Sequence, residues 1–134
     1  MIIGVGVDIV KVARFHTPQA TRFMQRVFSV REQEYIASKG EKGRAQTMAG
    51  LFAAKEAVAK TLGTGFGGFS PCDIEILRTK NGKPYVKLHS LAVRAFKKSV
   101  DAKISSTENG KRYFSVQVSI SHTATDAIAF AVLL

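Results

Sequence analysis

A run of small and apolar residues at positions 52–65 constrains the fold of this chain more than any other feature of the sequence. Alanine and leucine favour a helix, and a glycine such as Gly63 commonly follows the end of one. We therefore expect a long helix over about residues 45–62. Its otherwise small and apolar surface is interrupted by the charged residues Lys55, Glu56 and Lys60.

Glu56 and Lys60 are four positions apart, so they lie on neighbouring turns of one face of the predicted helix. One interpretation is an ion pair on a solvated face. The alternative is a face that meets a partner needing one carboxylate and a nearby ammonium. Small neighbours such as Ala53 and Ala57 weaken the first interpretation, because they indicate a face packed closely against something.

The bulk composition bounds the class of protein and its partners. A length of 134 residues fits a single domain, residues 1–134, with a core of its own. Lysine and arginine number 20 against 10 aspartates and glutamates, which gives a formal net charge of +10. This excess attracts anionic partners by long-range electrostatics. Nucleic acid, a nucleotide-like cofactor and an acidic protein all satisfy it, and charge alone does not choose among them.

The sequence shows no usual signal for export or membrane insertion. Cys72 is the only cysteine, so no disulfide can form within the chain. No apolar run reaches the roughly 18 residues that a membrane-spanning helix needs. Met1 leads directly into a strand-like pattern, which argues against a signal peptide. We expect a cytoplasmic protein that binds no membrane.

Residues 2–12 alternate in a way that predicts a strand with one buried face. Ile3, Val5, Val7 and Ile9 share one side of this strand, and Gly4, Gly6 and Asp8 share the other. The two glycines leave open space on the face to which Asp8 points, which would let a bulky ligand approach. Asp8 is then either a metal ligand at a strand end or an ordinary turn-forming or surface carboxylate.

Capping and turn signals predict the remaining elements. Thr17-Pro18 is typical of a helix start, Ser29 with Glu32 of a capping box, and Asn81-Gly82 of a hairpin turn. The predicted helices are residues 17–28, 29–39 and 90–103, and the predicted strands are residues 73–79, 85–88, 113–121 and 127–134, the last of them central. This order predicts an α+β domain with a mainly antiparallel sheet packed against the long helix.

Asp8 and Glu56 together supply the smallest carboxylate set that a magnesium site needs when substrate phosphates provide other ligands. Lys60 could then balance the charge of a phosphate or protonate a leaving group. The glycine-rich loop at residues 63–68 is not a P-loop, because it follows a helix and lacks the Gly-Lys-Ser/Thr ending.

A cluster of hydrogen-bonding side chains, Ser119-Ile120-Ser121-His122-Thr123, closes a predicted strand. It allows three interpretations: a catalytic Ser-His pair, a phosphate or nucleotide site, or a merely polar strand end. No acidic residue that would orient the histidine is evident, which disfavours the first.

Taken together, these segments resemble the holo-acyl-carrier-protein synthase family of phosphopantetheinyl transferases. The matching motifs occur in the family's order along the whole chain: Gly4-Val5-Gly6-Val7-Asp8-Ile9-Val10, Phe52-Ala53-Ala54-Lys55-Glu56-Ala57, Gly63-Thr64-Gly65, Asn81-Gly82-Lys83-Pro84 and Ser119-Ile120-Ser121-His122-Thr123. Each motif alone is weak, whereas five in order are highly specific. The resemblance implies the phosphopantetheinyl transferase fold and an enzyme that moves the phosphopantetheine arm of coenzyme A onto a serine of an apo acyl carrier protein, for fatty-acid biosynthesis.

The resemblance also implies roles for particular residues. Asp8 and Glu56 would hold magnesium against the coenzyme A diphosphate, and Lys60 would stabilise or protonate the leaving group. The expected contacts to the nucleotide side of coenzyme A come from Lys60, Gly63, Lys83, Pro84, Ser121, His122 and Thr123, with Arg44 as a further contributor of charge.

Carrier proteins of this kind are acidic, which would give the positive charge a target. Arg14, Arg22, Phe23 and Arg26 resemble the family's carrier-docking surface, although a solvated basic helix face is the competing interpretation of each residue. The family commonly forms homotrimers with active sites at subunit interfaces, and the same is expected here.

Two departures from the family pattern concern Leu51, where relatives usually place arginine, and segment 104–112, which is longer than the family's version. The first puts a phosphate or carrier contact in doubt. The main rival hypothesis is a small basic nucleic-acid-binding domain, which explains the charge but not Asp8 and Glu56. A non-catalytic, carrier-docking member of the fold is a second rival, disfavoured by the intact set of Asp8, Glu56 and Lys60.

Overall fold

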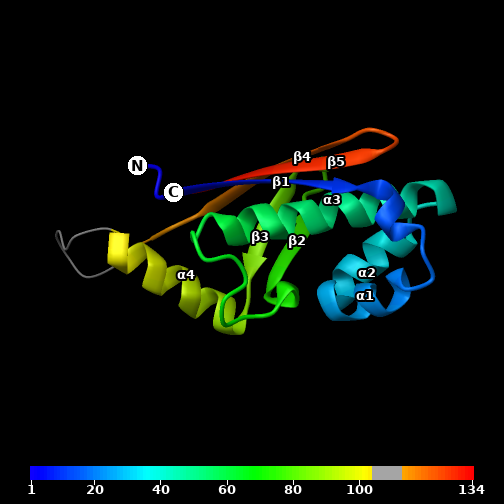
Figure 1. The fold of residues 1–134 in the computed structure, drawn as a ribbon. Coiled ribbons are helices and arrows are strands. Elements are labelled where there is room, and N and C mark those ends of the chain that lie inside the picture. Colours follow the sequence, from blue (N-terminus) through cyan, green and yellow to red (C-terminus); the bar gives the residue numbers. More distant parts are fainter. Residues whose placement is uncertain (104–112) are drawn as a thin grey trace.

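The computed structural model describes residues 1–103 and 113–134, and it shows the predicted α+β fold (Figure 1). Its main sheet is antiparallel and contains β1 (Gly4–Lys11), β5 (Asp126–Leu133) and β4 (Val116–His122), in that order. The prediction that the last strand is central is therefore confirmed. A separate antiparallel hairpin of β2 (Ile74–Arg78) and β3 (Pro84–Leu88) places β3 beside β4.

One long helix, α3 (Glu41–Lys60), lies along the main sheet (Figure 1). The short helices α1 (Ala20–Val27) and α2 (Val30–Ala37) gather at one end of the molecule, whereas α4 (Ser90–Lys103) lies at the other. Two 3₁₀ turns, η1 (Val12–Phe15) and η2 (Pro71–Asp73), join these parts. Among the described residues, no helix combines the length and the apolar character that a bilayer crossing requires.

The local signals at turns and caps act as the sequence predicts. Ser29 Oγ accepts a hydrogen bond from the backbone N–H of Glu32, while the Glu32 carboxylate accepts one from the N–H of Ser29. Gly63 follows α3 with φ of 84°, and Gly82 takes φ of 83° in the hairpin turn. Both values lie in the left-handed region that favours glycine.

Several element boundaries differ from prediction. The long helix begins at Glu41 rather than near residue 45, because its exposed, charged first turn adds nothing to the apolar pattern. Helix α1 begins at Ala20 rather than residue 17, after a turn in which the Ala20 N–H donates to Thr17 O. Strand β4 begins at Val116 rather than residue 113. Segment 104–112, with its predicted Asn109-Gly110 turn, lies outside the described residues.

The predicted open space beside Asp8 is absent, because the glycine face of β1 packs directly on α3. A Cβ atom on Gly4 would lie 2.0 Å from Thr61 O, and one on Gly6 would lie 2.0 Å from Ala57 O. The glycines therefore admit the helix backbone rather than a ligand. The opposite face of β1 is exposed, and Val7 retains 51% of its accessible surface. The expectation that these alternating apolar residues face the core of the chain is wrong.

A buried ion pair fixes α3 to the elements on its other side. The Nζ atom of Lys55 lies 2.7 Å from Glu32 Oε1 and also donates to Pro71 O and Ile74 O. Glu32 completes its own hydrogen bonds by accepting from the N–H of Ile76. Both charged side chains are fully buried, so each depends on the other and on these backbone partners.

A second polar cluster joins α2 to β2. The Glu75 carboxylate accepts hydrogen bonds from Arg31 and Ser29 Oγ and contacts His89 Nε2 at 3.0 Å. Burial by itself raises the pKa of Glu75, but the hydrogen bonds from Arg31, Ser29 and His89 outweigh it and lower the pKa to about 2. The carboxylate is thus ionised at neutral pH and stabilises the junction.

Candidate functional site

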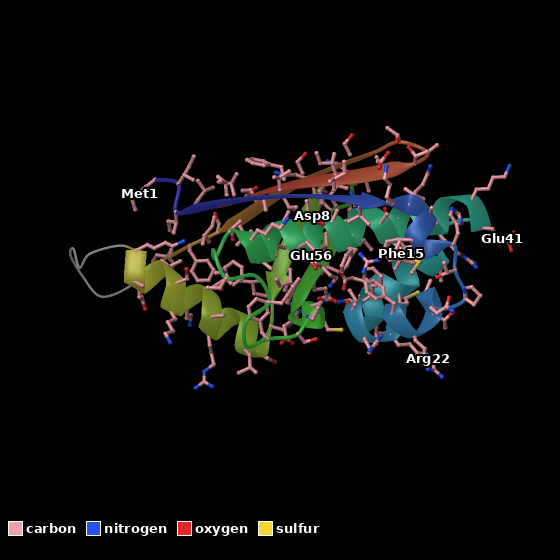
Figure 2. All side chains as sticks on the ribbon, in the orientation of Figure 1. Met1, Asp8, Phe15, Arg22, Glu41 and Glu56 are labelled. Atoms are coloured by element: carbon pink, nitrogen blue, oxygen red, sulfur yellow. The ribbon has the colours of Figure 1, made fainter. Side chains whose placement is uncertain are left out.

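The structure brings Asp8, Glu56 and Lys60 together where β1 crosses the C-terminal half of α3. Figure 2 shows Asp8 on the strand and Glu56 on the helix next to each other. Lys60 Nζ lies 2.9 Å from Asp8 Oδ1 and 3.0 Å from Val7 O. The observed ion pair of Lys60 is thus with Asp8 across two elements, rather than with Glu56 along one helix.

The electrostatics of this site favour a cation between the carboxylates. Burial, and then the negative charge of Asp8, raise the pKa of Glu56, while Lys60 and Arg14 oppose the change. A divalent cation would relieve this repulsion, and carboxylate oxygens are the ligands that magnesium prefers. Among residues 1–103 and 113–134, no group of three or more His, Cys, Asp or Glu side chains could hold a metal. An ion held by these two carboxylates would need its remaining ligands from water or from a bound molecule.

An aromatic cluster with a cation on it adjoins the carboxylates. Phe23 packs against Phe52 with ring centroids 5.0 Å apart, and Phe15 contacts both rings. The Arg14 guanidinium lies over Phe23 and Phe52, at 5.2 and 4.9 Å from the ring centroids. A cavity of about 320 Å³ opens beside Arg14, Phe15 and Phe23. Arg14 therefore joins the predicted docking surface to the carboxylate site.

The other predicted docking residues lie farther along α1. Arg22 and Arg26 are exposed, and Figure 2 shows Arg22 at the outer side of the helix. The backbone oxygen of Arg26 accepts a hydrogen bond from Cys72 Sγ, which leaves its guanidinium uninvolved in that contact.

The residues predicted on the nucleotide side do not gather around Asp8 within one chain. His122 lines a cavity of about 350 Å³ with Tyr35, Lys39 and Arg78. Lys83 and Pro84 line a different cavity of about 530 Å³ between β3 and β4. Neither lining includes Asp8 or Glu56. Within the described residues, His122 and Lys83 thus line cavities other than the place where Asp8 and Glu56 meet.

The other predicted contacts have distinct settings. Ser121 of β4 pairs with Ile128 of β5 and lies on the exposed side of the sheet. The Thr123 hydroxyl accepts hydrogen bonds from the N–H groups of Thr125 and Asp126 in the hairpin turn. Gly63 is exposed just after α3. Arg44 Nε donates to Lys39 O at 3.1 Å near the start of that helix.

Sequence reasoning missed the residues around His122. Tyr35, Lys39 and Arg78 come from α2, the turn after it and β2, and no spacing in the sequence indicates that they meet. Leu51, named above as a departure from the family pattern, is fully buried in the core.

Comparisons with known proteins agree with this geometry. The sequence model of the 4'-phosphopantetheinyl transferase superfamily matches residues 4–119. The chain is 46% identical to the holo-[acyl-carrier-protein] synthase of Clostridium acetobutylicum, over 99% of this chain and 98% of that protein. It is 44% identical to the synthase of the same name from Clostridium perfringens, over 99% and 94% of the two chains.

Solved structures give the same result. The holo-[acyl-carrier-protein] synthase of Neisseria meningitidis superposes with a TM-score of 0.80 at 28% identity, covering 100% of this chain and 99% of that one. The Bacillus anthracis synthase, in complex with CoA (3',5'-ADP), superposes with a TM-score of 0.74 at 33% identity, covering 99% and 96% of the two chains. From the facing carboxylates, the fold and the matched sequence, we conclude that the chain belongs to the 4'-phosphopantetheinyl transferase superfamily.

Proposed function

We propose that this protein transfers the phosphopantetheine group of coenzyme A to a serine of an apo acyl carrier protein, with magnesium as cofactor. The observation that carries the proposal is the pairing of Asp8 with Glu56 beside Lys60, in a chain that matches relatives named for this activity along nearly its whole length. The solved relative in complex with coenzyme A supports the same substrate.

In this proposal Asp8 and Glu56 hold the magnesium ion. The metal would neutralise charge on the coenzyme A diphosphate as the phosphorus–oxygen bond to the leaving adenosine bisphosphate breaks. The carrier serine forms the new bond to that phosphorus, and its proton passes to water or to one of the two carboxylates. The two carboxylates lie on β1 and α3, whose main chains contact each other directly at the glycines of β1. The spacing of the carboxylates therefore does not depend on flexible side chains between the two elements, which suits them to this task.

Lys60 serves the leaving group. Its ammonium now contacts Asp8 Oδ1 and Val7 O, and half of its side-chain surface is accessible, so it can reach an incoming phosphate. A cation at this place stabilises negative charge on the departing oxygen or donates a proton to it. Until substrate and metal bind, Lys60 also balances the negative charge of the carboxylates.

The carrier protein docks on the basic and aromatic surface around α1. Arg14, Arg22 and Arg26 supply positive charge to an acidic partner, and Phe23 supplies apolar contact beside the cavity at Arg14. Arg14 lies close enough to influence the pKa of Glu56, so a carrier bound there would deliver its serine next to the metal. The net charge of +10 would speed the encounter.

A homotrimer with interfacial active sites completes the proposal. The outer face of the main sheet exposes large apolar side chains, among them Val7 at 51% and Phe130 at 47%. Exposed apolar surface of this kind marks an interaction site. A second copy on this face would also supply the His122 and Lys83 cavities that one chain keeps apart from Asp8.

The physiological setting we propose is fatty-acid biosynthesis in the cytoplasm. The four relatives compared above all carry the synthase name. They therefore give no support to the rival hypothesis of a nucleic-acid-binding domain. The basic charge that suggested it is explained equally well by an acidic carrier protein.

A transfer assay tests the proposal. The protein is incubated with apo carrier, coenzyme A and magnesium, and the carrier is then weighed by mass spectrometry. We expect the mass increase of one phosphopantetheine group, and its loss in Asp8→Asn. An unchanged carrier mass with the wild-type protein would reject the enzyme, whereas full transfer after magnesium chelation would reject the metal.

A further inference from the structure

Lys55 is a buried charge that plays no part in the proposed reaction. Its side chain has no accessible surface, and its ammonium uses all three N–H groups, donating to Glu32 Oε1 at 2.7 Å, Pro71 O at 2.9 Å and Ile74 O at 2.6 Å. Replacing a buried ion pair by apolar residues of similar volume often leaves stability unchanged or raises it. Stability alone therefore does not account for a lysine at this place, and fixing the orientation of α3 is the alternative role.

The other side of α3 has little that would fix the rotation of the helix. The glycines of β1 rest on the backbone oxygens of Ala57 and Thr61, so strand and helix meet there without interlocking side chains. Packed helices are normally held in register by side-chain ridges that fit into grooves. The buried residues of α3 around Glu56 are mostly alanines, which form only shallow ridges. Main-chain contact thus limits how closely α3 approaches β1 but does little to stop the helix from turning about its axis.

Helix geometry places Glu56 between the two contacts. At about 100° per residue, Lys55 and Ala57 lie on nearly opposite sides of α3, and Glu56 lies roughly a right angle from each. The Lys55 side is bonded to α2, η2 and β2, whereas the Ala57 side rests on β1, the strand that carries Asp8. A rotation of α3 that broke the Lys55 bonds would therefore move the Glu56 carboxylate relative to Asp8.

We propose that Lys55 is a positioning residue, whose bonds to Glu32 and to the main chain at η2 and β2 fix the rotation of α3 and thereby hold the Glu56 carboxylate opposite Asp8 for the metal. This inference rests on the proposed function. Hydrogen bonds suit the task better than apolar contacts do, because they weaken steeply when the donor turns away from its acceptor. Groups that orient a metal ligand in this way typically contribute about 10- to 100-fold to metal affinity or activity.

A double variant tests the inference. Lys55→Met alone would leave the Glu32 carboxylate buried without its cation, which strongly destabilises a fold. Lys55→Met combined with Glu32→Gln removes both charges together, and the glutamine oxygen can still accept from the backbone N–H of Ile76. We expect this double variant to fold.

Metal affinity is measured without any transfer reaction. Mn²⁺, which prefers the same oxygen ligands as magnesium, is titrated into the protein with coenzyme A and no carrier, and electron paramagnetic resonance reports the free ion. We expect the double variant to bind Mn²⁺ about 10- to 100-fold more weakly than wild type. In the transfer assay its kcat should fall by a similar factor. Its KM for the carrier should be nearly unchanged, because Arg14, Arg22 and Arg26 remain in place.

Glu75→Gln is the matched control. It disrupts the other buried polar cluster between α2 and β2, and among the described residues Glu75 bonds to Arg31, Ser29 and His89 but to no residue of α3. At a temperature where thermal unfolding shows the proteins to be folded, Glu75→Gln should keep the Mn²⁺ affinity and kcat of wild type. A folded double variant with wild-type affinity and kcat would overturn the inference, and so would an equal loss of affinity in Glu75→Gln.

Glu32→Asp provides the same test in a protein that keeps both charges. Its shorter carboxylate draws the Lys55 ammonium out of line, so Mn²⁺ affinity and kcat should fall by a smaller factor than in the double variant. If the double variant does not fold, a Glu32→Asp protein with wild-type affinity and kcat would overturn the inference. Asp8→Asn separates this inference from the proposed function, because a wild-type protein that binds Mn²⁺ no better than Asp8→Asn would reject the metal site itself.

Discussion

At the scale of single residues, the environment of Glu56 is unfavourable in the free protein and useful in the proposed reaction. Burial and the charge of Asp8 both raise its pKa, so the ionised form is disfavoured in the folded chain. In the proposed reaction, a bound cation would offset the cost of ionising Glu56. Stability and function therefore conflict at this residue, as often happens where charges are gathered for catalysis.

Glu56→Gln should separate the two effects. In the absence of magnesium the variant removes a destabilised carboxylate, so its midpoint of thermal unfolding at pH 8 should rise by a few degrees. The wild type should lose stability as the pH rises past the ordinary glutamate pKa to the raised value, because the folded chain holds that proton more tightly. Transfer by the variant should fall by roughly 100-fold or more.

Glu41→Gln is the control for this experiment, since Glu41 is an exposed residue in the first turn of the same helix. It should retain transfer activity. If the Glu56→Gln protein were less stable than wild type without magnesium, the conclusion that the ionised Glu56 side chain destabilises the folded chain would be wrong.

The glycines of β1 allow a second test at this scale. Gly6→Ala places a Cβ atom 2.0 Å from the backbone oxygen of Ala57, so strand and helix must separate. We expect a loss of about 3 kcal/mol in the free energy of unfolding, measured by urea denaturation. Gly43→Ala on α3 meets only Lys39 Cβ at 3.4 Å and should instead be neutral or stabilising. Equal stability of the two variants would show that β1 does not rest on the helix backbone.

At the scale of elements, buried polar contacts rather than apolar packing alone define how α2 and β2 meet. Glu75 joins Arg31 and Ser29 of the α2 region to His89 before α4. Glu32 and Lys55 make a second, fully buried link to α3. Such links tolerate little rearrangement, because breaking one partner leaves the other charge buried.

The Glu75 cluster predicts a particular acid sensitivity. Its pKa is about 2 in the folded chain against an ordinary value of 4.5, so its stabilisation is complete above the ordinary value and is lost as the pH falls toward 2. At about 1.4 kcal/mol per pKa unit, the contribution at pH 7 is on the order of 3 kcal/mol. Glu75→Gln should therefore be less stable than wild type at pH 7, with a gap that narrows by pH 3 in urea unfolding. The exposed Glu34→Gln should show no such gap, and a gap independent of pH would exclude this origin.

At the scale of the whole molecule, α3 covers one face of the main sheet, and the other face is bare among the residues that the structure describes. Residues Val5, Val7, Ile9, Ile128 and Phe130 keep large exposed fractions on the bare face. The proposed homotrimer would bury this surface and would combine Asp8 of one subunit with His122 of another.

Mixing inactive variants tests that combination. Asp8→Asn and His122→Ala should each transfer poorly alone, because each lacks one half of every site. When the two are unfolded together and refolded as a mixture, some sites should contain an intact Asp8 and an intact His122 from different subunits, and transfer should recover to roughly a quarter of the wild-type rate if subunits mix at random. Analytical ultracentrifugation should show one trimeric species. A mixture as inactive as its parents would place both residues of each site in one chain.

Much of this architecture could be predicted from the sequence, because it depends on local signals. The Ser29 capping box, the Gly82 turn and the alternation in β1 all correspond to observed elements. The side on which β1 packs could not be predicted. The alternating apolar pattern is the same whether the apolar face of the strand packs on a helix of its own chain or on a second copy of the protein. The burial of Lys55 in an ion pair could not be predicted from local patterns either, since its partner Glu32 lies 23 residues away in the sequence. The pairing of Asp8 with Lys60 likewise joins elements 52 residues apart.

The direct main-chain contact between β1 and α3 has a consequence for which substitutions this protein can accept. Most packed interfaces adjust to substitution by shifting rotamers, and the shift then spreads to whatever the interface supports. At Gly4 and Gly6 there are no rotamers to shift, because main chain rests on main chain. At these two positions, main-chain contact sets how closely the strand that bears Asp8 approaches the helix that bears Glu56. A side chain larger than hydrogen at either glycine would push the strand away from the helix, so these two positions should be the least variable of β1.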